Sequence, residues 1–531
     1  MEFLFLFVLA VIVLLVAVAN RLGIAYPILL LLGGIAIGYI PGAPVLTMPP
    51  DLVLVVFLPP LLYWESVTAP ESEFRTSAWW IFQLAFGLVI ITTAAVAVVA
   101  HALVPALSWA VAFLLGAIVS STDEVAFAPI AERLRVPRHV IATIEGESLV
   151  NDATSLILYA AALAAVVTGT FSLMHAAGTL VMSVVGAIAI GIIAGSIAVL
   201  AWHLVKDAML QVVISLAVPY LSYLPAQHFG VSGVLAVVTT GLFVNRFTPT
   251  VLLPAARERA TGFWVTIVFV TNAIIFVLVG TQLHSIMAGL TGYAPLALIG
   301  YGVAVSLTVI VVRFVWVFAQ GLLPITNEPE HIEGKADWSH VAVLAWAGFR
   351  GGVSLAAALA IPFETSLGAF PHRDLVIFLT FCVLVATLVG QGGTLPLLIR
   401  WLRITDDGAG AAEERIALSR TSQAALDRID RLERDGGVPP SLAAFLRKRF
   451  QIRQREFDPV DESAAAAAAR STAQYRVLEN GLIDAQRAEL IKLRDQGKID
   501  NTVLRRIQRL LDLESEEIDL LDAAGHAEVN E

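Results

Sequence analysis

The chain has 531 residues, of which 57% are hydrophobic, and its formal net charge at pH 7 is −10. This composition is too apolar for an ordinary soluble protein. The charges are unevenly distributed, because residues 401–531 hold 20 of the 34 Lys and Arg and 25 of the 44 Asp and Glu. We therefore expect a membrane domain, residues 1–403, followed by a water-exposed helical domain, residues 404–531.

Apolar segments divided by polar residues, Gly and Pro predict about thirteen membrane-spanning helices, at about 20 apolar residues for each crossing. Their expected extents are residues 3–19, 26–41, 51–64, 78–101, 106–130, 140–168, 176–203, 208–223, 230–245, 258–285, 293–320, 339–361 and 374–400. The first segment has no basic region before it, so we interpret it as a retained span rather than a signal peptide. The expected fold class is an all-α polytopic membrane protein.

Basic residues in the predicted loops give the orientation. With the N-terminus outside, ten Lys and Arg fall in cytoplasmic loops and only Arg373 falls in the opposite set. Such a bias is typical of membrane proteins, whose cytoplasmic loops are rich in Lys and Arg. We expect a multi-pass protein of the cell membrane, with a cytoplasmic C-terminal tail. The ten are Arg21, Arg75, Arg133, Arg135, Arg138, Lys206, Arg246, Arg257, Arg259 and Lys335.

Two predicted spans contain polar interruptions. Residues 120–124, Ser-Ser-Thr-Asp-Glu, interrupt the fifth span, and glycines flank Arg350 in the twelfth. Unwound backbone at membrane depth requires hydrogen-bond partners from protein or a wet cavity, so both spans are candidate broken helices. They lie seven spans apart and so run in opposite directions, which fits a transporter built from inverted repeats with its site where the two broken helices meet.

The sixth predicted span carries the most informative polar residues. Ser148, Asp152, Ser155 and Tyr159 share one helical face, and Glu147 and Asn151 form a neighbouring row. Ionisable groups at membrane depth are costly and by default mark an ion pathway. We expect this face to meet the fifth and twelfth spans. Arg313, inside the eleventh span, is expected to be a structural partner of an acid or of backbone carbonyls.

Na⁺ is a hard cation, and carboxylate, hydroxyl and backbone carbonyl oxygens are suitable ligands for it. Asp152, Glu147, Ser148 and the backbone oxygen of Thr122 could supply them. Asp152 could hold either a proton or a metal cation, each displacing the other, and that competition is itself an exchange mechanism. No His or Cys cluster has transition-metal spacing. We expect no enzymatic activity and no cofactor beyond the transported ions.

Four motifs lie in order along the first 400 residues: Phe-Leu-Pro-Pro-Leu-Leu-Tyr-Trp-Glu at 57–65, Thr-Asp at 122–123, Glu-Ser at 147–148 with Asn-Asp at 151–152, and Gly-Phe-Arg-Gly-Gly-Val-Ser at 348–354. On these motifs the chain resembles the monovalent cation:proton antiporter family 1, in particular its prokaryotic NhaP-type sodium/proton antiporters. The resemblance implies an NhaA-like antiporter fold with two broken, crossing helices. It also implies a homodimer in which a helical core moves past an interface domain, an elevator-like form of alternating access.

The resemblance also implies roles for individual residues. Asp152 would be the shared cation and proton site, with Thr122, Glu147 and Ser148 as further ligands. Asp123 would sit at the helix break beside the ion, although it could instead cap a helix, and Asn151 would brace the unwound strand. Glu65 would bond Arg350, a pairing for which Glu147 could compete.

Asn151 bears on stoichiometry, because an amide cannot titrate. One carboxylate then exchanges about one proton for one monovalent cation, and a membrane potential would exert no thermodynamic drive on the cycle. We therefore expect electroneutral exchange of Na⁺, or of Li⁺ or K⁺, for H⁺. The alternatives are a potassium-selective K⁺/H⁺ antiporter and, in other classes, a cation channel or a membrane sensor. The sequence shows no repeated filter loop and no phosphate loop or kinase motif.

The predicted tail reads as charged amphipathic helices, and residues 401–531 have a net charge of −5 (20 basic against 25 acidic residues), which argues against a nucleic-acid partner. A helical apolar stripe predicts that its last helix packs against another element. The tail could regulate transport, support the dimer or have no regulatory effect. The stripe consists of Leu504, Ile507, Leu510, Leu511, Ile518 and Leu521.

Overall fold

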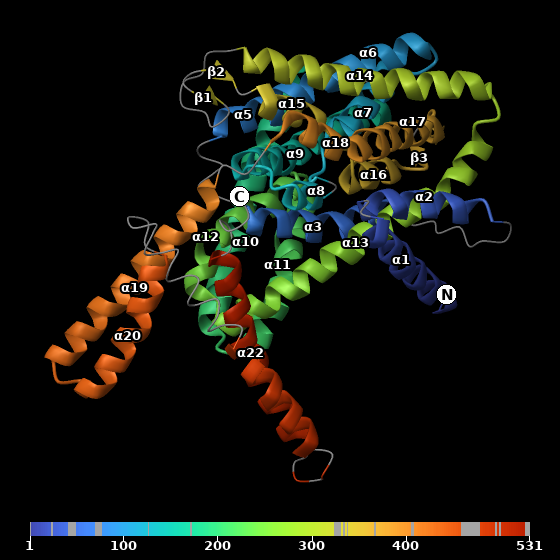
Figure 1. Cartoon of the computed structure of the whole chain (residues 1–531). Coiled ribbons are helices and arrows are strands. Elements are labelled where there is room, and N and C mark those ends of the chain that lie inside the picture. The colour runs from blue at the N-terminus through green and yellow to red at the C-terminus, as the bar shows by residue number, and fades with distance from the viewer. Residues whose placement is uncertain are drawn as a thin grey trace. The chain divides into compact units, whose positions relative to one another are not determined.

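A computed structural model of the chain describes residues 2–22, 25–40, 49–69, 77–125, 127–169, 173–322, 331–332, 335–336, 338–365, 368–404, 408–457, 478–479, 481–493, 496, 498 and 501–525. The chain separates into two compact units, Met1–Thr405 and Asp406–Glu531. Both are built almost entirely from helices (Figure 1).

The first unit opens with three helices: α1 (Glu2–Leu22), α2 (Tyr26–Gly38) and α3 (Pro50–Thr68). A span with a π-helical centre follows, made of α5 (Ala78–Phe82), η1 (Gln83–Leu88) and α6 (Val89–Leu103). The next three helices are α7 (Trp109–Ser120), the short α8 (Ala128–Arg133) and the long α9 (Arg138–Thr168).

The middle of the first unit contains five long helices: α10 (Leu173–Leu204), α11 (Ala208–His228), α12 (Gly233–Val251), α13 (Pro254–Gly289) and α14 (Pro295–Gly321). Its last helices are α15 (Trp338–Trp346), α16 (Gly352–Leu359), α17 (Arg373–Val385), the π-helix η2 (Ala386–Gln391) and α18 (Gly392–Leu402). Two-residue strands pair as antiparallel hairpins, β1 (His331–Ile332) with β2 (Lys335–Ala336) and β3 (Glu364–Thr365) with β4 (Gly368–Ala369).

Local chemistry explains where several helices begin. Ser108, Asp207 and Ser232 precede α7, α11 and α12, and each side chain accepts a hydrogen bond from the backbone N–H three residues later. Such N-caps satisfy one of the N–H groups that a helix start leaves without a partner. Proline stands at the start of α2, α3, α13 and α14, where its fixed φ suits a helix and its missing N–H costs nothing.

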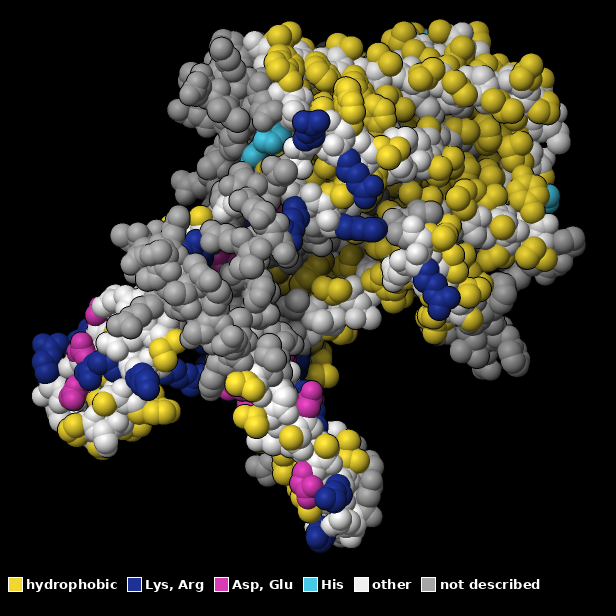
Figure 2. Space-filling view, in the orientation of Figure 1, with side chains coloured by type: hydrophobic (Ala, Val, Ile, Leu, Met, Phe, Trp, Pro, Cys, Tyr) yellow, Lys and Arg dark blue, Asp and Glu magenta, His cyan; other side chains and the backbone are white. Residues whose placement is uncertain are grey.

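Among the described residues, eight helices are long and apolar enough to cross a membrane, and four shorter apolar helices have 10–17 residues. Helices α15 and α16, with nine and eight residues, are too short to belong to either of these two groups of helices. The fold class predicted from the sequence is therefore confirmed, whereas the count of thirteen spans is not. Apolar side chains cover much of the face of this unit seen in Figure 2. On α14, for example, Leu296, Ile299 and Val315 are more than half exposed, as expected of a lipid-facing surface.

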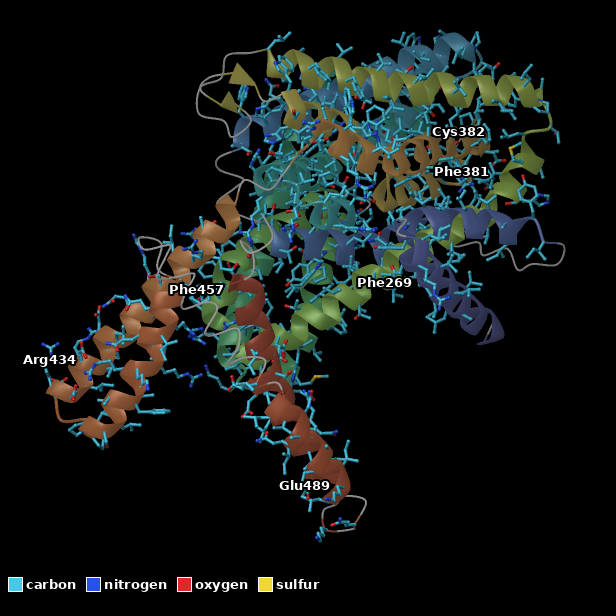
Figure 3. All side chains as sticks on the ribbon, viewed as in Figure 1. Phe269, Phe381, Cys382, Arg434, Phe457 and Glu489 are labelled. Atoms are coloured by element: carbon cyan, nitrogen blue, oxygen red, sulfur yellow. The ribbon has the colours of Figure 1, made fainter. Side chains whose placement is uncertain are left out.

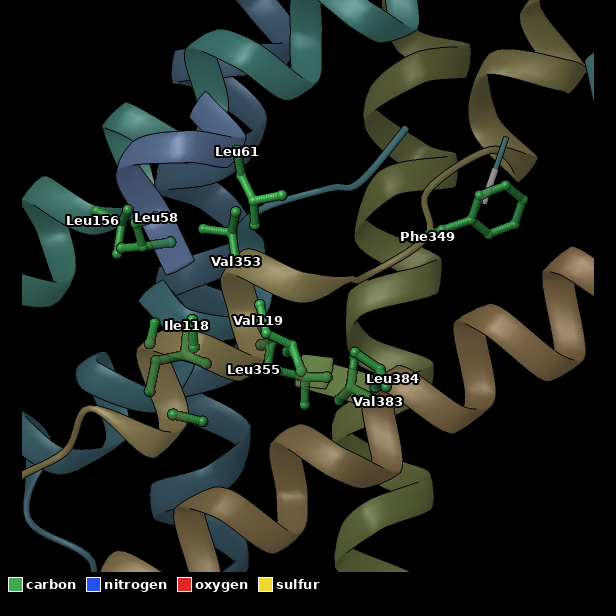
Figure 4. Packing of buried hydrophobic residues seen from close by; sticks show 14 of the residues in the cluster. Leu58, Leu61, Ile118, Val119, Leu156, Phe349, Val353, Leu355, Val383 and Leu384 are labelled. Atoms are coloured by element: carbon green, nitrogen blue, oxygen red, sulfur yellow. The ribbon is translucent and has the colours of Figure 1, made fainter. Parts of the chain in front are cut away.

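The interior of the first unit is a continuous apolar core. Figure 4 shows part of it, where Leu58 and Leu61 of α3 approach Val353 of α16 and Leu156 of α9. Close helix contacts depend on glycine: a Cβ on Gly34 of α2 would lie 2.6 Å from the carbonyl oxygen of Val277 in α13. Cys382 on α17, labelled in Figure 3, is a free thiol that packs against Gly302 of α14.

The described residues of the second unit form two helical pairs. Helices α19 (Ala409–Arg434) and α20 (Pro440–Glu456) are joined by ion pairs from Arg447 to Asp430 and Glu433. The helical residues 481–493 pack against α22 (Asn501–Gly525) through Ile483. The predicted stripe on α22 is confirmed in part. Leu504, Leu511 and Ile518 are buried, whereas Ile507 and Leu510 are 36% and 57% exposed, and the side chain of Leu521 lies outside the described residues.

Candidate ion-binding site

Two helices of the first unit are interrupted at the positions that the sequence predicted. The helix α7 ends at Ser120 and α8 begins at Ala128, while α15 ends at Trp346 and α16 begins at Gly352. The extended segments that follow α7 and α15 cross each other. At the crossing, the backbone N–H of Asp123 donates to the carbonyl oxygen of Phe349 at 2.9 Å. Figure 4 shows Phe349 on the extended chain that leads into α16. The crossing satisfies backbone groups that the helix breaks expose.

The carboxylate of Asp123 stabilises this crossing by accepting two backbone hydrogen bonds. Its Oδ1 accepts a hydrogen bond from the N–H of Val125 at 2.7 Å, and its Oδ2 accepts one from the N–H of Gly352 at 2.9 Å. A Cβ on Gly351 would lie 1.3 Å from that Oδ2, so only glycine allows the carboxylate to approach so closely. Asp123 therefore acts as a cap for the first turn of α16, which is the alternative that the sequence left open for it.

Helix α9 presents its polar face to the first interruption. Asp152 is 2% exposed, and its Oδ1 accepts a hydrogen bond from Ser121 Oγ at 2.5 Å. Ser148 Oγ donates to the carbonyl oxygen of Thr122 at 3.0 Å, and Asn151 Nδ2 donates to Thr122 Oγ1 at 2.5 Å. Four of the residues predicted to form the site, Thr122, Ser148, Asn151 and Asp152, therefore lie together. Ser121 joins them and was not predicted.

Glu147 pairs with an arginine side chain, whereas the sequence suggested that it binds the transported cation. Arg313 of α14 donates to both of its carboxylate oxygens, with Nη2 lying 2.8 Å from Oε2, and both side chains are 1% exposed. Arg313 also donates to the carbonyl oxygen of Leu344, through Nε at 3.1 Å and Nη2 at 2.8 Å. The prediction that Arg313 is an ion-pair or carbonyl partner is thus confirmed on both counts. A guanidinium group on both oxygens leaves Glu147 poorly suited to bind a second cation.

Arg350 contacts backbone carbonyls rather than an acid. Its Nε donates to the carbonyl oxygen of Val119 at 2.6 Å and its Nη1 to that of Gly348 at 2.8 Å. The expected bond with Glu65 is not formed, and Glu65 Oε2 is a buried atom without a hydrogen-bond partner in the described part of the chain. The physical reason is local: the two broken helices leave carbonyl groups free, and a guanidinium with five donors satisfies them at short range.

The arrangement gathers oxygen atoms of the types that bind alkali cations. They are the Asp152 carboxylate, the hydroxyls of Ser121 and Ser148 and the carbonyl of Thr122. No group of three or more His, Cys, Asp or Glu side chains within the described ranges is placed to hold a metal ion. The donor set, with one carboxylate and neutral oxygens, suits a monovalent cation better than a transition metal.

Two interrupted chains that cross inside a helical membrane domain, beside a buried carboxylate, define the class of ion-coupled secondary transporters. The family model described as "Sodium/hydrogen exchanger, transmembrane" matches residues 7–401. The chain belongs to this family of cation/proton antiporters.

Relatives agree with this assignment. The chain is 37% identical over 518 residues to an uncharacterised Na⁺/H⁺ exchanger of Mycobacterium tuberculosis, covering 95% of this chain and 93% of the relative. It is 32% identical over 364 residues to the sodium, potassium, lithium and rubidium/H⁺ antiporter of Bacillus subtilis, covering 66% and 54%. Its fold is similar to that of the sodium proton antiporter MjNhaP1 from Methanocaldococcus jannaschii, with a TM-score of 0.58, 19% identity and coverage of 76% and 99%.

Proposed function

We propose that this antiporter exchanges one Na⁺ for one H⁺ across the cell membrane, and that the two ions compete for Asp152. The observation that carries the proposal is the position of this carboxylate, which is buried and bonded to Ser121 in the interrupted segment that crosses the second broken helix. A charged side chain at membrane depth is costly unless a partner offsets its charge. Either a bound proton or a bound cation does so, and the two cannot do so together.

The ligands proposed for Na⁺ are a carboxylate oxygen of Asp152, the hydroxyl of Ser148 and the backbone oxygen of Thr122. Ser121 is added to this set, because its hydroxyl already touches Asp152. Glu147 is assigned to the ion pair with Arg313 instead. Asp123 and Asn151 support the site, the first by capping α16 and the second by bonding the side chain of Thr122.

Asn151 sets the proposed stoichiometry. Its amide is fully buried beside Asp152 and cannot carry a proton, so Asp152 is the one titratable group in the proposed set of ligands. The moving part of the transporter binds either one Na⁺ or one H⁺, so it carries the same net charge in both directions. Exchange is then electroneutral, and a transmembrane voltage does not drive it.

Alternating access completes the proposed cycle. We place the N-terminus outside and the tail in the cytoplasm, because all but one of the loop Lys and Arg then face inward. We assign to the protein a homodimeric assembly and an elevator-like movement of the part that holds the crossing. Both assignments follow from its resemblance to NhaP-type antiporters.

The second candidate concerns selectivity among Na⁺, Li⁺ and K⁺. The name of the Bacillus subtilis relative includes sodium, potassium, lithium and rubidium, so a broad range of cations is the second candidate. Hydroxyl, carbonyl and carboxylate oxygens bind all of these ions, and the dimensions of the site decide among them.

The experiment uses inside-out vesicles that are acidified by respiration and then receive the chloride salt of each cation, while the lumenal pH is followed. The proposal predicts that Na⁺ dissipates the pH gradient, that a potassium–valinomycin clamp of the voltage leaves the rate unchanged, and that Asp152→Asn abolishes the response. Asp207→Asn is the matched control, because Asp207 is an exposed N-cap and Asn caps equally well. Exchange at the parental rate by Asp152→Asn would show that the site is wrongly assigned.

A further inference from the structure

The broken helix α16 is held at both ends by residues of other elements. It has eight residues, which correspond to a length of about 12 Å. The extended chain before it separates it from α15, so no helical hydrogen bonds fix its position along its axis. A helix this short has little stability of its own. Its residues are buried in the core, and the groups that bind its two ends set its position along its axis.

Asp123 binds the first of these ends, through the N–H of Gly352. Arg373, the first residue of α17, binds the other. Its Nε donates to the carbonyl oxygen of Ile361 at 2.9 Å, and its Nη2 donates to that of Leu359 at 3.3 Å. Leu359 and Ile361 are 5% and 0% exposed, so these carbonyls have little access to water. A helix leaves its last carbonyl groups without intrahelical donors, and Arg373 supplies the donors here.

The guanidinium of Arg373 is itself fixed. Its central carbon lies 4.3 Å from the centroid of the Phe363 ring, in the loop between α16 and β3. The carboxylate of Asp374 lies 3.9 Å from its Nη1. A planar group that lies over an aromatic ring and donates hydrogen bonds along its edge loses little further freedom when it holds a carbonyl. Arg373 thus forms a rigid link between the end of α16 and the start of α17.

A continuous chain of contacts leads from this link to the candidate ion site. Arg373 holds the end of α16, Gly352 at its start bonds Asp123, and Asp123 follows Thr122 in the chain. The carbonyl of Thr122 is bonded by Ser148 and is one of the proposed cation ligands. A displacement of α16 would therefore be passed to an oxygen atom beside Asp152.

We propose that Arg373 is a positioning residue of the exchange reaction, which sets the geometry of the cation site by holding the far end of α16. This inference rests on the proposed site at Asp152 and Thr122. Arg373 touches no transported ion, and its effect passes through the backbone. Loss of a residue that orients the ligands of a metal site commonly lowers metal affinity about 10- to 100-fold.

The test compares Arg373→Gln, Arg373→Lys and the unmodified protein in vesicles, by the cation concentration that gives half-maximal exchange and by the ratio of Li⁺ to Na⁺ rates. Arg373→Gln should raise the half-saturating Na⁺ concentration about tenfold and change the Li⁺/Na⁺ ratio. Arg373→Lys should give an intermediate shift, because an ammonium group keeps the charge but cannot hold two carbonyls in a fixed fork. Tyr293→Phe removes a hydrogen bond to neighbouring His372 and should change neither value.

A merely structural role would lower the amount of folded protein or the maximal rate, and would leave the half-saturating concentration and the Li⁺/Na⁺ ratio unchanged. That result in folded Arg373→Gln, or in Arg373→Lys should the first variant not fold, would overturn the inference. Hydrogen exchange of the backbone amides 352–361 gives a readout independent of transport, and it should be faster in Arg373→Gln. Absence of exchange in the unmodified protein would count against the proposed function instead.

Discussion

Arg313 on α14 and Glu147 on α9 form a buried ion pair, in which the guanidinium donates to both carboxylate oxygens, five residues before Asp152 on the same helix. The residues are 166 positions apart in the chain. Thr122 Oγ1 also donates to Glu147 Oε1 at 3.2 Å, so the pair touches the interrupted segment. The pair therefore ties α14, α9 and the first crossing chain together without using the carboxylate that is proposed to carry the ions.

Removal of one member of this pair should be more harmful than removal of both. Arg313→Met leaves a buried carboxylate without its cation, and Glu147→Gln leaves a buried guanidinium without its anion, so each should cost about 3–5 kcal/mol of stability. The double variant should recover part of this loss. Thermal unfolding in detergent measures all three, and additive losses in the double variant would contradict a direct pairing.

The contact between Gly351 and Asp123 makes a second prediction. Gly351→Ala should abolish exchange, because a Cβ would stand 1.3 Å from Asp123 Oδ2 and displace the carboxylate from the N–H of Gly352. The prediction rests on this contact alone, since φ at Gly351 is −143° and lies outside the left-handed region that favours glycine. The matched control is Gly262→Ala on α13, where a Cβ would meet nothing within 4 Å. Full activity in Gly351→Ala would show that the chains do not cross so closely.

Arg350 and Glu65 should behave as independent residues. Arg350→Ala should harm folding and exchange, because the carbonyls of Val119 and Gly348 lose their donor, at about 1.5–3 kcal/mol for each hydrogen bond to a charged group. Glu65→Gln should leave the stability of the Arg350 contacts unchanged. A double-mutant cycle on thermal stability should give a coupling energy below about 0.5 kcal/mol. A coupling of several kcal/mol would restore the pairing that the resemblance implied.

The sequence predicted the interruptions because their chemistry is local. Glycines beside Arg350, and a run of hydroxyl and acidic residues at 120–124, cannot continue an apolar helix, so their positions along the chain carried the information. The α-helical period placed Ser148 and Asp152 on one face of α9, and both side chains face the interruption after α7. Ser121 was within reach of this reasoning, since it stands in the same polar run.

Partners across long sequence distances were not predictable in this way. Arg313 and Glu147 were each recognised as polar residues in apolar spans, but spacing along a helix gives no pairing between α9 and α14. The resemblance assigned a carboxylate partner to Arg350, whereas backbone carbonyls at the helix breaks supply its hydrogen bonds. The tail shows the same limit, because the stripe on α22 was visible but only the arrangement of helices decides which of its leucines is covered.

Truncation after residue 405 should preserve part of the exchange activity. The crossing chains, Asp152 and Arg373 all belong to the compact unit Met1–Thr405, and the ion pairs of Arg447 lie within the other unit. Each unit thus contains the contacts that hold its own helices. The shortened protein should run as a dimer in size-exclusion chromatography and should dissipate a pH gradient on addition of Na⁺, at a reduced or altered rate if the tail regulates transport. Complete loss of exchange in an intact dimer would show that the tail takes part in the transport cycle itself.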